Sequence, residues 1–462
     1  MDKERLKELY RSHRPVFHFT SKTGWINDPN GLILYGGYYH LFYQHYPYGV
    51  THGDMHWGHA RTKDFMEWEE LPVALCPDGL GTIFSGCMVY DEKNTSGFGT
   101  DDNPPLVAVF THHLEQGGAC IQYQSLAYSL DGGMNFKKYE GNPVLNLQLK
   151  DFRDPKVFWY QPTEKWVMLV SAGKEILFFT SGNLRDWMPG KVFPGQGLRP
   201  DEIWECPDLV ELKEGRGDGN KRKWVLFVSQ NTLDYVKTGI RYFVGVFTGE
   251  GFMEQDSAGE ELYVDFGRDN YAAATYAGTG GRVIQQGWMN CWSYAEKLPE
   301  AGFRGSMTFP RELSLRKTSE GYRVIQKPAQ EAEEKWKLWQ QIVPDNAMVT
   351  AEKIPGVFRY TPEGETGKII FCSRNGRFQI TVDFVYGKIT VSRSGCGEGF
   401  EDSHFQETRW MYFCREAARE LYIVVDVTSV EVFAADGEAV GTFQYFVGEP
   451  FDRIITGTKC GE

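Results

Sequence analysis

The sequence predicts an all-β protein with two domains. From about residue 16 to residue 325, short segments rich in β-branched and aromatic residues alternate with Gly, Pro, Asp and Asn. Apolar runs of helical period are scarce, whereas 15% of the residues are aromatic. A length of 462 residues exceeds what one hydrophobic core usually supports, so a second domain is expected.

A short phrase recurs in the first region. It occurs as "ARTKDFMEW" at 60–68, "AYSLDGGMNF" at 127–136 and "FTSGNLRDW" at 179–187. Each copy has a Ser or Thr, then Asp, Asn or Gly turn residues, then an aromatic residue that can cover the next turn. A recurrence every ~50–70 residues is typical of four-stranded blades arranged radially. Independent hairpins with similar turns are the alternative.

The pattern changes after residue 326. The segment "KPAQEAEEKWKLWQQI" at 327–342 places Trp336 and Trp339 on one helical face, which predicts a linker helix packed between domains. From 343 to 462 the strands return, with an alternation that predicts an antiparallel two-sheet sandwich. Asp436-Gly437 marks a hairpin within it. The predicted blades therefore occupy residues 1–326.

Charge and cysteine content exclude several classes of protein. A net charge of −13 argues against nucleic acid and anionic membranes as partners and favours a neutral ligand. The segment "MDKERLKELYRSHRP" lacks the apolar core of a secretory signal, so we expect a cytoplasmic protein, although a trimmed secreted form would look similar. The 9 scattered cysteines contain no C-x-x-C pair, which favours reduced thiols over disulfides or structural zinc.

Three acidic residues occur in similar settings. Asp28 lies in "WINDPNGL", which is a strong turn signal; Asp154 directly precedes a proline in "FRDPKVF"; Glu205 lies two residues before a proline in "WECPDLV". Proline removes a ladder donor and fixes the backbone, so each carboxylate is expected at a strand end. Three such sites spread along a repeating β chain are expected to converge on one centre.

Glycoside hydrolysis is the chemistry that fits three acids best. It needs one carboxylate as nucleophile or base and a second, protonated carboxyl as general acid. A third acid can bind sugar hydroxyls, and Trp and Tyr provide flat faces for sugar rings. A calcium site is the weaker alternative, because the spacing matches no EF-hand loop, and no G-x-S-x-G elbow indicates a serine hydrolase. We expect neither a metal nor a cofactor.

The motifs "WINDPNG", "FSG" at 84–86, "FRDP" and "WECPD" resemble, in order, the motif series of glycoside hydrolase family 32. That family contains invertases, exo-inulinases, levanases and sucrose-6-phosphate hydrolases. Further similar phrases, from "FYQHYPYG" at 42–49 to "VDVTSVEVFAADG" at 425–437, extend the resemblance over nearly the whole chain. It implies a five-bladed β-propeller followed by a C-terminal β-sandwich, with a funnel-shaped pocket on the propeller axis.

The resemblance also implies catalytic roles. Asp28 would be the nucleophile, Glu205 the general acid and then the base, and Asp154 would hold fructose hydroxyls and stabilise the transition state. Retention would place the Asp28 and Glu205 carboxyls ~5–5.5 Å apart. The implied activity is a retaining exo-β-fructosidase acting on fructans, fructo-oligosaccharides or sucrose. A fructosyltransferase, a sucrose-6-phosphate hydrolase and a catalytically lapsed carbohydrate-binding protein are the alternatives.

Other residues match pocket positions of the family. His52 stands where a Trp is common in the family and Asp54 where a Pro is common, so this wall is more polar and more acidic, which disfavours a phosphorylated sugar. The sequence leaves linkage preference and oligomeric state open. The predicted substrate-binding residues are Asn27, Gln44, Trp57, Phe84, Ser85 and Arg153, and the candidate wall residues are His52, Asp54, Cys206, Asp269, Tyr271 and Trp288. For Asp269 and Tyr271, bracing of a loop is the alternative to lining the funnel.

Overall fold

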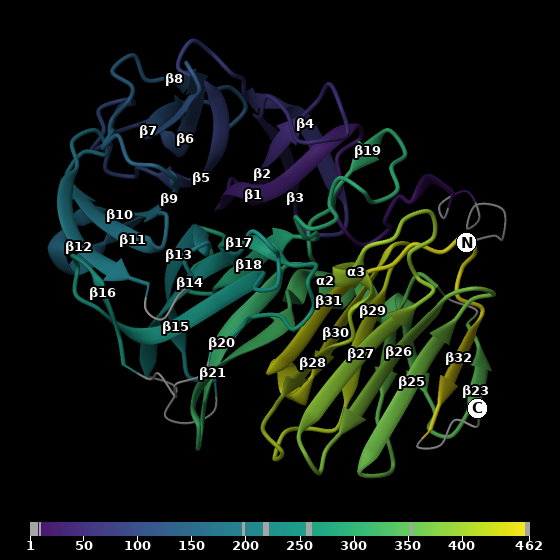
Figure 1. Ribbon diagram of the computed structural model, residues 1–462. Helices are drawn as coiled ribbons and strands as arrows, with labels where there is room; N and C mark the ends of the chain where they lie inside the picture. The colour runs from purple at the N-terminus through teal and green to yellow at the C-terminus, as the bar shows by residue number, and fades with distance from the viewer. Residues whose placement is uncertain are drawn as a thin grey trace.

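The computed structural model describes residue 8 and residues 11–195, 199–215, 221–255, 261–351 and 354–457. Five sheets surround a common centre and two further sheets pack beside them (Figure 1). Blade 1 contains β1 (Gly24–Tyr35), β2 (Tyr38–Tyr46), β3 (His56–Thr62) and β4 (Trp68–Leu75), with β19 (Phe303–Arg304) parallel to β1. Blade 2 contains β5 (Thr82–Tyr90), β6 (Leu106–Gln116), β7 (Ala119–Ser129) and β8 (Lys137–Lys138).

The remaining blades have the same order. Blade 3 contains β9 (Phe152–Tyr160), β10 (Lys165–Ala172), β11 (Glu175–Ser181) and β12 (Met188–Pro194), with η1 (Gln161–Thr163) between β9 and β10. Blade 4 contains β13 (Ile203–Lys213), β14 (Arg222–Asn231), β15 (Gly239–Phe247) and β16 (Phe252–Glu254). Blade 5 contains β17 (Tyr271–Thr275), β18 (Ile284–Trp288), β20 (Arg311–Thr318) and β21 (Gly321–Pro328).

The first strand of each blade lines the axis. β1, β5, β9, β13 and β17 contact one another in turn, and β17 contacts β1, so the ring is closed. The recurring phrase marks the connection from the third to the fourth strand in blades 1, 2 and 3. In these turns the hydroxyl groups of Thr62, Ser129 and Ser181 each donate a hydrogen bond to the Asp or Asn side chain two residues later. The three distances are 3.2, 2.7 and 3.2 Å. The radial interpretation of the repeat is therefore confirmed.

All five inner strands carry the same irregularity. In each, two residues lie opposite one residue of the second strand, which is the geometry of a β-bulge. The bulged pairs are 27–28, 84–85, 154–155, 206–207 and 272–273. A bulge re-aims side chains and increases the local twist. The three acids therefore lie at or beside bulges near the start of inner strands.

This corrects the expectation of turns at strand ends. "WINDPNGL" is not a turn, because Trp25–Leu32 belongs to β1, and its turn-forming residues instead accommodate the bulge. Pro155 and Pro207 are tolerated inside strands because each lies in a bulge, which lacks the regular ladder bond, and Pro29 directly follows the bulge of β1.

The sandwich occupies the end of the chain. One sheet has the order β22 (Gln340–Val343), β24 (Gly356–Tyr360), β29 (Leu421–Val425), β30 (Ser429–Ala434) and β31 (Ala439–Gln444). The other has the order β23 (Met348–Thr350), β32 (Arg453–Thr456), β25 (Thr366–Cys372), β26 (Arg377–Asp383), β27 (Lys388–Ser394) and β28 (Arg409–Tyr412). α3 (Ser403–Gln406) precedes β28, and η3 (Ala435–Gly437) forms the predicted hairpin between β30 and β31.

The linker helix is shorter than the predicted segment 327–342. α2 (Gln330–Trp336) is followed by η2 (Lys337–Trp339), while β21 and β22 take up the two ends of the segment. Trp336 is fully buried, with its ring centroid 4.1 Å from that of Phe309 in the propeller and 6.1 Å from that of Tyr422 in the sandwich. No helix in the described ranges is long and apolar enough to cross a membrane. The eight described cysteines form no disulfide with one another, and Cys460 lies outside the described residues.

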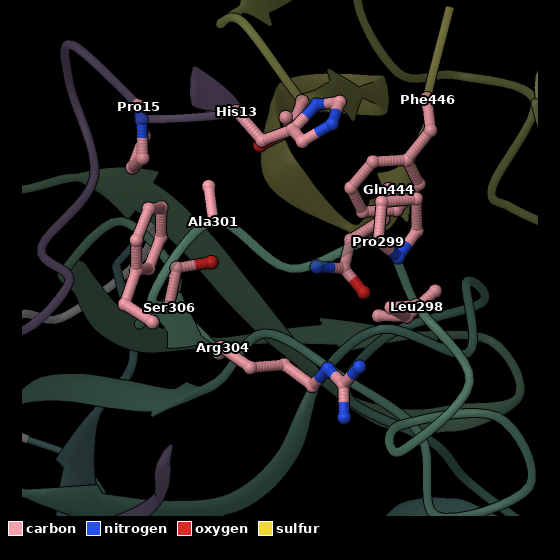
Figure 2. A pocket seen from close by; sticks show the side chains of 12 residues that line it. His13, Pro15, Leu298, Pro299, Ala301, Arg304, Ser306, Gln444 and Phe446 are labelled. Atoms are coloured by element: carbon pink, nitrogen blue, oxygen red, sulfur yellow. The ribbon is translucent and has the colours of Figure 1, made fainter. Parts of the chain in front are cut away.

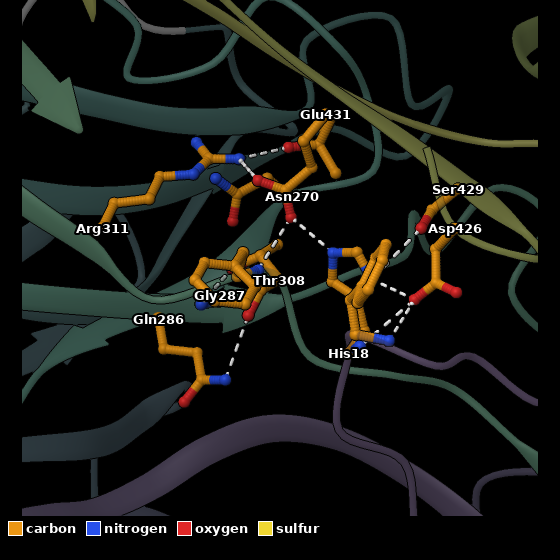
Figure 3. Close-up of polar contacts among 12 residues, drawn as sticks. His18, Asn270, Gln286, Gly287, Thr308, Arg311, Asp426, Ser429 and Glu431 are labelled. Atoms are coloured by element: carbon orange, nitrogen blue, oxygen red, sulfur yellow. Dashed lines mark hydrogen bonds and ion pairs between the residues drawn. The ribbon is translucent and has the colours of Figure 1, made fainter. Parts of the chain in front are cut away.

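A buried ionic network joins the two domains (Figure 3). His18 Nδ1 lies 2.8 Å from Asp426 Oδ2, and His18 Nε2 lies 3.0 Å from Glu431 Oε1. Arg311 of β20 donates to Glu431 Oε2 at 2.8 Å and to Asp265 Oδ2 at 3.0 Å. Burial alone would lower the pKa of His18, but the two carboxylates raise it to about 9. Burial alone would raise the pKa of Glu431, but Arg311 and His18 lower it to about 2.

We expect this network to stabilise the fold most between about pH 4.5 and 6.5. The pKa of His18 is raised from 6.5 to about 9, so its contribution is full below pH 6.5 and is lost as the pH rises through 9. The pKa of Glu431 is lowered from 4.5 to about 2, so its contribution is full above pH 4.5 and is lost as the pH falls through 2. The difference in free energy of unfolding between wild type and His18→Gln, measured by urea titration, should shrink from pH 6.5 to 10. A difference that stays constant over this range would contradict the assignment.

A small cavity lies at the same domain boundary (Figure 2). It has a volume of about 20 Å³ and is lined by residues that include His13, Leu298, Ser306, Gln444 and Phe446. Such a volume holds about one water molecule. It is too small for a sugar, so it is a packing feature of the interface.

Candidate active site

The three acids from three blades come together around Cys206. The Cys206 thiol lies 3.4 Å from Asp28 Oδ2 and 3.6 Å from Asp154 Oδ2, and its backbone N–H donates to Asp154 Oδ2 at 3.0 Å. Glu205 is the preceding residue of the same inner strand. The expected convergence on one centre is therefore present, and the cluster lies on the inner strands β1, β9 and β13.

Backbone strain accompanies this arrangement. Asp154, Cys206 and Ala272, which are the first bulge residues of blades 3, 4 and 5, have φ angles of +66°, +47° and +52°. Side chains with a Cβ rarely adopt this left-handed conformation, and it costs on the order of 1–3 kcal/mol per residue. The blades hold these residues there, which directs the Asp154 carboxylate and the Cys206 N–H toward each other.

Asp28 is held at both carboxylate oxygens. The Ser85 hydroxyl donates to Oδ2 at 2.7 Å, and Asn27 Nδ2 donates to Oδ1 at 3.0 Å. Burial raises the pKa of Asp28 above its usual value, the Ser85 and Asn27 bonds oppose the rise, and the nearby Glu205 charge adds to it. The donors favour the ionised form and fix its orientation, as a nucleophilic carboxylate requires.

Ser85→Ala is expected to move the acid limb of kcat/KM to higher pH. The variant removes a donor that lowers the pKa of Asp28, so the carboxylate is protonated at a higher pH. A lost charge-assisted bond of ~1.5 kcal/mol corresponds to a shift of about one pH unit. A pH profile of fructose release, with the exposed Ser394→Ala as control, measures the shift. An unmoved acid limb would show that Ser85 does not tune this carboxylate.

Glu205 is also held at both oxygens, but it keeps access to solvent. Arg153 donates to Oε1 from Nη2 at 3.1 Å and from Nε at 3.3 Å, and the Tyr271 hydroxyl donates to Oε2 at 2.6 Å. The Glu205 side chain is 17% exposed. Asp151 fixes Arg153 from the other side, through a bond of 2.9 Å to Nη1. Burial and the Glu205 charge raise the pKa of Tyr271, so its hydroxyl stays a donor.

Asp154 holds a proton more strongly than an ordinary carboxyl. Burial raises its pKa to about 7; the Arg153 charge opposes the rise, while the Asp28 and Glu205 charges add to it. The Asp154 carboxyl therefore keeps its proton to a higher pH than an isolated carboxyl does. The cluster can therefore exchange protons in the pH range where enzymes work.

Aromatic rings flank the acids. The Phe84 ring stacks on His113, with centroids 4.2 Å apart. The His52 ring centroid lies 6.2 Å from that of Phe84 and 5.8 Å from that of Trp292. The Trp25 ring stacks on the Trp292 ring, with centroids 6.1 Å apart. Burial lowers the pKa of His52, which favours the neutral imidazole. His52 thus lies between two aromatic groups.

Three of the predicted pocket residues have a relative exposure of 0%. Trp57 is fully buried and donates from Nε1 to the Phe84 carbonyl at 3.1 Å, so it supports Phe84 from within the core. Trp288 is fully buried beside Trp25. Asp269 is bonded to Arg393 of the sandwich at 2.7 Å and accepts from the Tyr294 hydroxyl. Of the two alternatives for Asp269, the structure therefore has the bracing role, and Asp269 does not line a pocket wall.

The remaining predicted residues differ in exposure. Gln44 is buried, and its Nε2 has no hydrogen-bond partner within the described ranges. It lies opposite the bulge that carries Asp28, so it is a free donor beside the cluster. Asp54 is exposed, and its backbone carbonyl lies 2.8 Å from His56 Nδ1.

Sequence reasoning missed several residues. Asp151 and Gln122 both accept from Arg153, and Trp292 and His113 stack on the rings that flank the acids. The phrase "KDFRDP" contains Asp151 two residues before Arg153, so the two opposite charges are close along the chain, although Asp151 lies just before β9 and has a φ of +54°. No local signal identifies the other three residues.

A closed ring of five blades that gathers three acids in one cluster, two of them held at both carboxylate oxygens, fits the two-carboxyl chemistry of a glycoside hydrolase. The family model "Glycosyl hydrolases family 32 N-terminal domain" matches residues 18–328, and "Glycosyl hydrolases family 32 C terminal" matches residues 358–456. The chain belongs to glycosyl hydrolases family 32.

Two named relatives and two solved structures are similar to this chain over most of its length. The chain is 42% identical over 452 residues to a levanase of Bacillus subtilis, covering 93% of this chain and 66% of that protein. It is 33% identical over 487 residues to an extracellular exo-inulinase of Aspergillus awamori, covering 94% and 89% of the two chains. A crystal structure of the Aspergillus awamori exo-inulinase matches with a TM-score of 0.84 at 31% identity, covering 97% and 96%. A fructofuranosidase of Schwanniomyces occidentalis complexed with fructosylnystose matches with a TM-score of 0.82 at 29% identity, covering 96% and 94%.

Proposed function

We propose that this protein is a retaining exo-β-fructosidase. It hydrolyses terminal non-reducing β-D-fructofuranosyl residues of fructans, fructo-oligosaccharides or sucrose. The observation that carries the proposal is the pairing of an oriented, part-buried Asp28 carboxylate with a Glu205 carboxyl that also keeps access to solvent, in one cluster. The names of the levanase and exo-inulinase relatives, and the sugar bound to the related fructofuranosidase, support fructosides as the substrate class.

The first step is transfer of the fructosyl unit to the protein. An Asp28 carboxylate oxygen attacks the anomeric carbon, and the bond from that carbon to the glycosidic oxygen breaks. Glu205 gives its proton to the departing oxygen, so the leaving sugar departs as a neutral alcohol. The ester bond to Asp28 is the covalent intermediate.

The second step releases fructose. The Glu205 carboxylate takes a proton from a water molecule, which attacks the anomeric carbon as the bond to Asp28 breaks. Two inversions at one carbon give net retention. The third acid, Asp154, accepts hydrogen bonds from fructose hydroxyls, which strengthen as positive charge develops on the ring. Arg153 positions Glu205 through both donated bonds.

The acidic surroundings favour an unphosphorylated sugar. The chain carries a net charge of −13, and an exposed Asp54 lies near His52. Both repel a phosphate group. We therefore expect sucrose to be a better substrate than sucrose 6-phosphate.

The test is product analysis with sucrose, inulin and levan side by side. Free fructose should be the first product from each polymer, with no shorter fructan appearing before it. Sucrose 6-phosphate should react more slowly than sucrose. Early release of oligosaccharides would indicate cleavage within the chain, and formation of longer fructosides at the expense of free fructose would indicate a transferase. Either result would contradict the proposal.

A further inference from the structure

Three side chains that can bind a metal lie together on the second and third strands of blade 2, β6 and β7 (Figure 1). They are His113, Glu115 and Cys120, and one ligand atom from each lies within 4.8 Å of the other two. His113 Nε2 lies 3.6 Å from Glu115 Oε1. Two ligands on one tetrahedral zinc ion, each at ~2.0–2.1 Å from the metal, are about 3.4 Å apart. These two atoms therefore already have nearly the spacing that zinc requires.

A tight hairpin turn brings these residues onto one face. The dipeptide Gly117-Gly118 has φ angles of +61° and +80°, which is the left-handed backbone of a two-residue hairpin turn. This turn places Glu115 opposite Cys120. Two residues further from the turn, His113 lies opposite Gln122. Alternate residues of a strand share a face, and residues paired across two strands share it too. The cluster therefore depends on the register of the hairpin.

His113 is the fixed member of this cluster, and the other two side chains are accessible. The His113 ring stacks on Phe84 with an angle of 1° between the ring planes, and the His113 side chain is 15% exposed. The Glu115 side chain is 80% exposed, and Cys120 is exposed and forms no disulfide with another described cysteine. A metal ion can reach the cluster from solvent, and the two accessible side chains can close on it.

We propose that His113, Glu115 and Cys120 bind a divalent transition metal of the zinc class beside the catalytic acids. An imidazole nitrogen, a thiolate and a carboxylate form a donor set that suits Zn²⁺, whereas Ca²⁺ and Mg²⁺ prefer oxygen ligands alone. The Cys120 thiol releases one proton to solvent when its sulfur binds the metal, and a water molecule completes the four ligands. The negative charges of the thiolate and the carboxylate balance the charge of the ion.

A chain of hydrogen bonds links this metal site to the general acid. Arg153 Nη1 donates to Gln122 Oε1 at 3.2 Å, and Gln122 Nε2 lies 3.1 Å from His113 Nδ1. A guanidinium group can only donate, so the amide oxygen of Gln122 faces Arg153 and its NH₂ group faces His113. His113 Nδ1 is therefore the acceptor of that bond, and the proton of the neutral ring is on Nε2.

Metal binding reverses this arrangement. A metal on Nε2 leaves the ring proton of His113 on Nδ1, where it faces the NH₂ group of Gln122. The amide must turn over to accept from Nδ1, and Arg153 then faces NH₂ instead of an acceptor. Arg153 holds Glu205 through two donated bonds, so the bound metal disturbs the general acid and slows hydrolysis. This consequence rests on the proposed function.

Cobalt serves as the probe of the site. Co²⁺ takes the same ligands as zinc, and a thiolate bound to it gives a charge-transfer absorption in the near ultraviolet. Wild type should bind one Co²⁺ per chain with this absorption, and Zn²⁺ should displace it. Cys120→Ala should abolish the absorption. Cys120→Ala and Glu115→Gln should each weaken Zn²⁺ binding at least about 10-fold, because even an outer partner of a metal ligand contributes that much. Cys76→Ala, which removes another exposed cysteine, is the matched control and should change neither quantity.

Rates of sucrose hydrolysis test the link to Arg153. Saturating Zn²⁺ should lower kcat of wild type about 3–10-fold, which is the usual effect of one lost hydrogen bond, and a chelator should restore it. Cys120→Ala should keep its rate at the same concentration of zinc. Gln122→Glu supplies a carboxylate that accepts from both His113 and Arg153. This variant should therefore bind Zn²⁺ at least as tightly as wild type, without any fall from its own metal-free rate.

Several results would overturn the inference. A wild type that binds no Co²⁺ would do so. An absorption that persists in Cys120→Ala would place the metal on another thiol, such as Cys206 among the acids. Equal inhibition of wild type and Cys120→Ala by Zn²⁺, or bound Zn²⁺ with unchanged kcat, would contradict the link through Gln122. If wild type released no fructose but Cys120→Ala still lost the cobalt absorption, the proposed function would fail and the metal site would stand.

Discussion

Asp28→Asn is expected to abolish fructose release, with kcat for sucrose reduced about 10⁴-fold or more. The amide has the same shape as the carboxylate, but it cannot form the covalent bond to the anomeric carbon. Its NH₂ group would also face the Ser85 hydroxyl or Asn27 Nδ2, which both donate to Asp28 in the wild type. Single-turnover kinetics with sucrose would show whether the chemical step itself is lost.

The matched control for this prediction is Asp101→Asn. Asp101 is an exposed aspartate in the loop between β5 and β6, and its replacement should leave kcat unchanged. Thermal unfolding should show that Asp28→Asn is folded. A folded variant that retains more than about a tenth of wild-type kcat would rule out Asp28 as the nucleophile.

Glu205→Gln is expected to lower kcat for sucrose about 10²–10⁴-fold, which is the usual contribution of a general acid. The variant cannot protonate the departing oxygen. With a nitrophenyl β-fructofuranoside the leaving group needs no proton, so formation of the intermediate should proceed at close to the wild-type rate. Added azide should then speed turnover, because it attacks the intermediate without a general base.

Glu250→Gln, an exposed position in the same blade as Glu205, serves as the control and should behave as wild type. The difference between the two substrates is the informative quantity. An equal loss of rate for sucrose and for the nitrophenyl fructoside would show that Glu205 positions the substrate rather than transferring a proton.

The blade architecture was predictable because its signals are local. The Ser/Thr–Asx phrase forms a hydrogen bond between two side chains that are two residues apart, as Ser129 and Asp131 show. It can therefore be recognised without knowledge of the fold. The three acids were recognisable for a similar reason, since each precedes a proline within a short motif. Pro and Asx residues then predicted turns, whereas the structure uses them to build bulges inside strands.

The bulges could not be read from the chain because they depend on the partner strand. The register of β1 against β2 decides that Asn27 and Asp28 share one partner, and no residue of β1 encodes that register alone. The role of Asp269 also depends on a partner that is distant in the sequence. Asp269 pairs with Arg393, which is 124 residues away in the other domain, so only the packed structure distinguishes a brace from a pocket wall.

The central claim is double displacement on Asp28, and trapping with methanol tests it most directly. In a sucrose reaction that contains methanol, methanol replaces water in the second step, and the product is a stable methyl fructofuranoside. Carbon NMR of that product distinguishes its two anomers. Retention through a covalent intermediate predicts the β-anomer alone, whereas the α-anomer would mean a single displacement and would contradict the account.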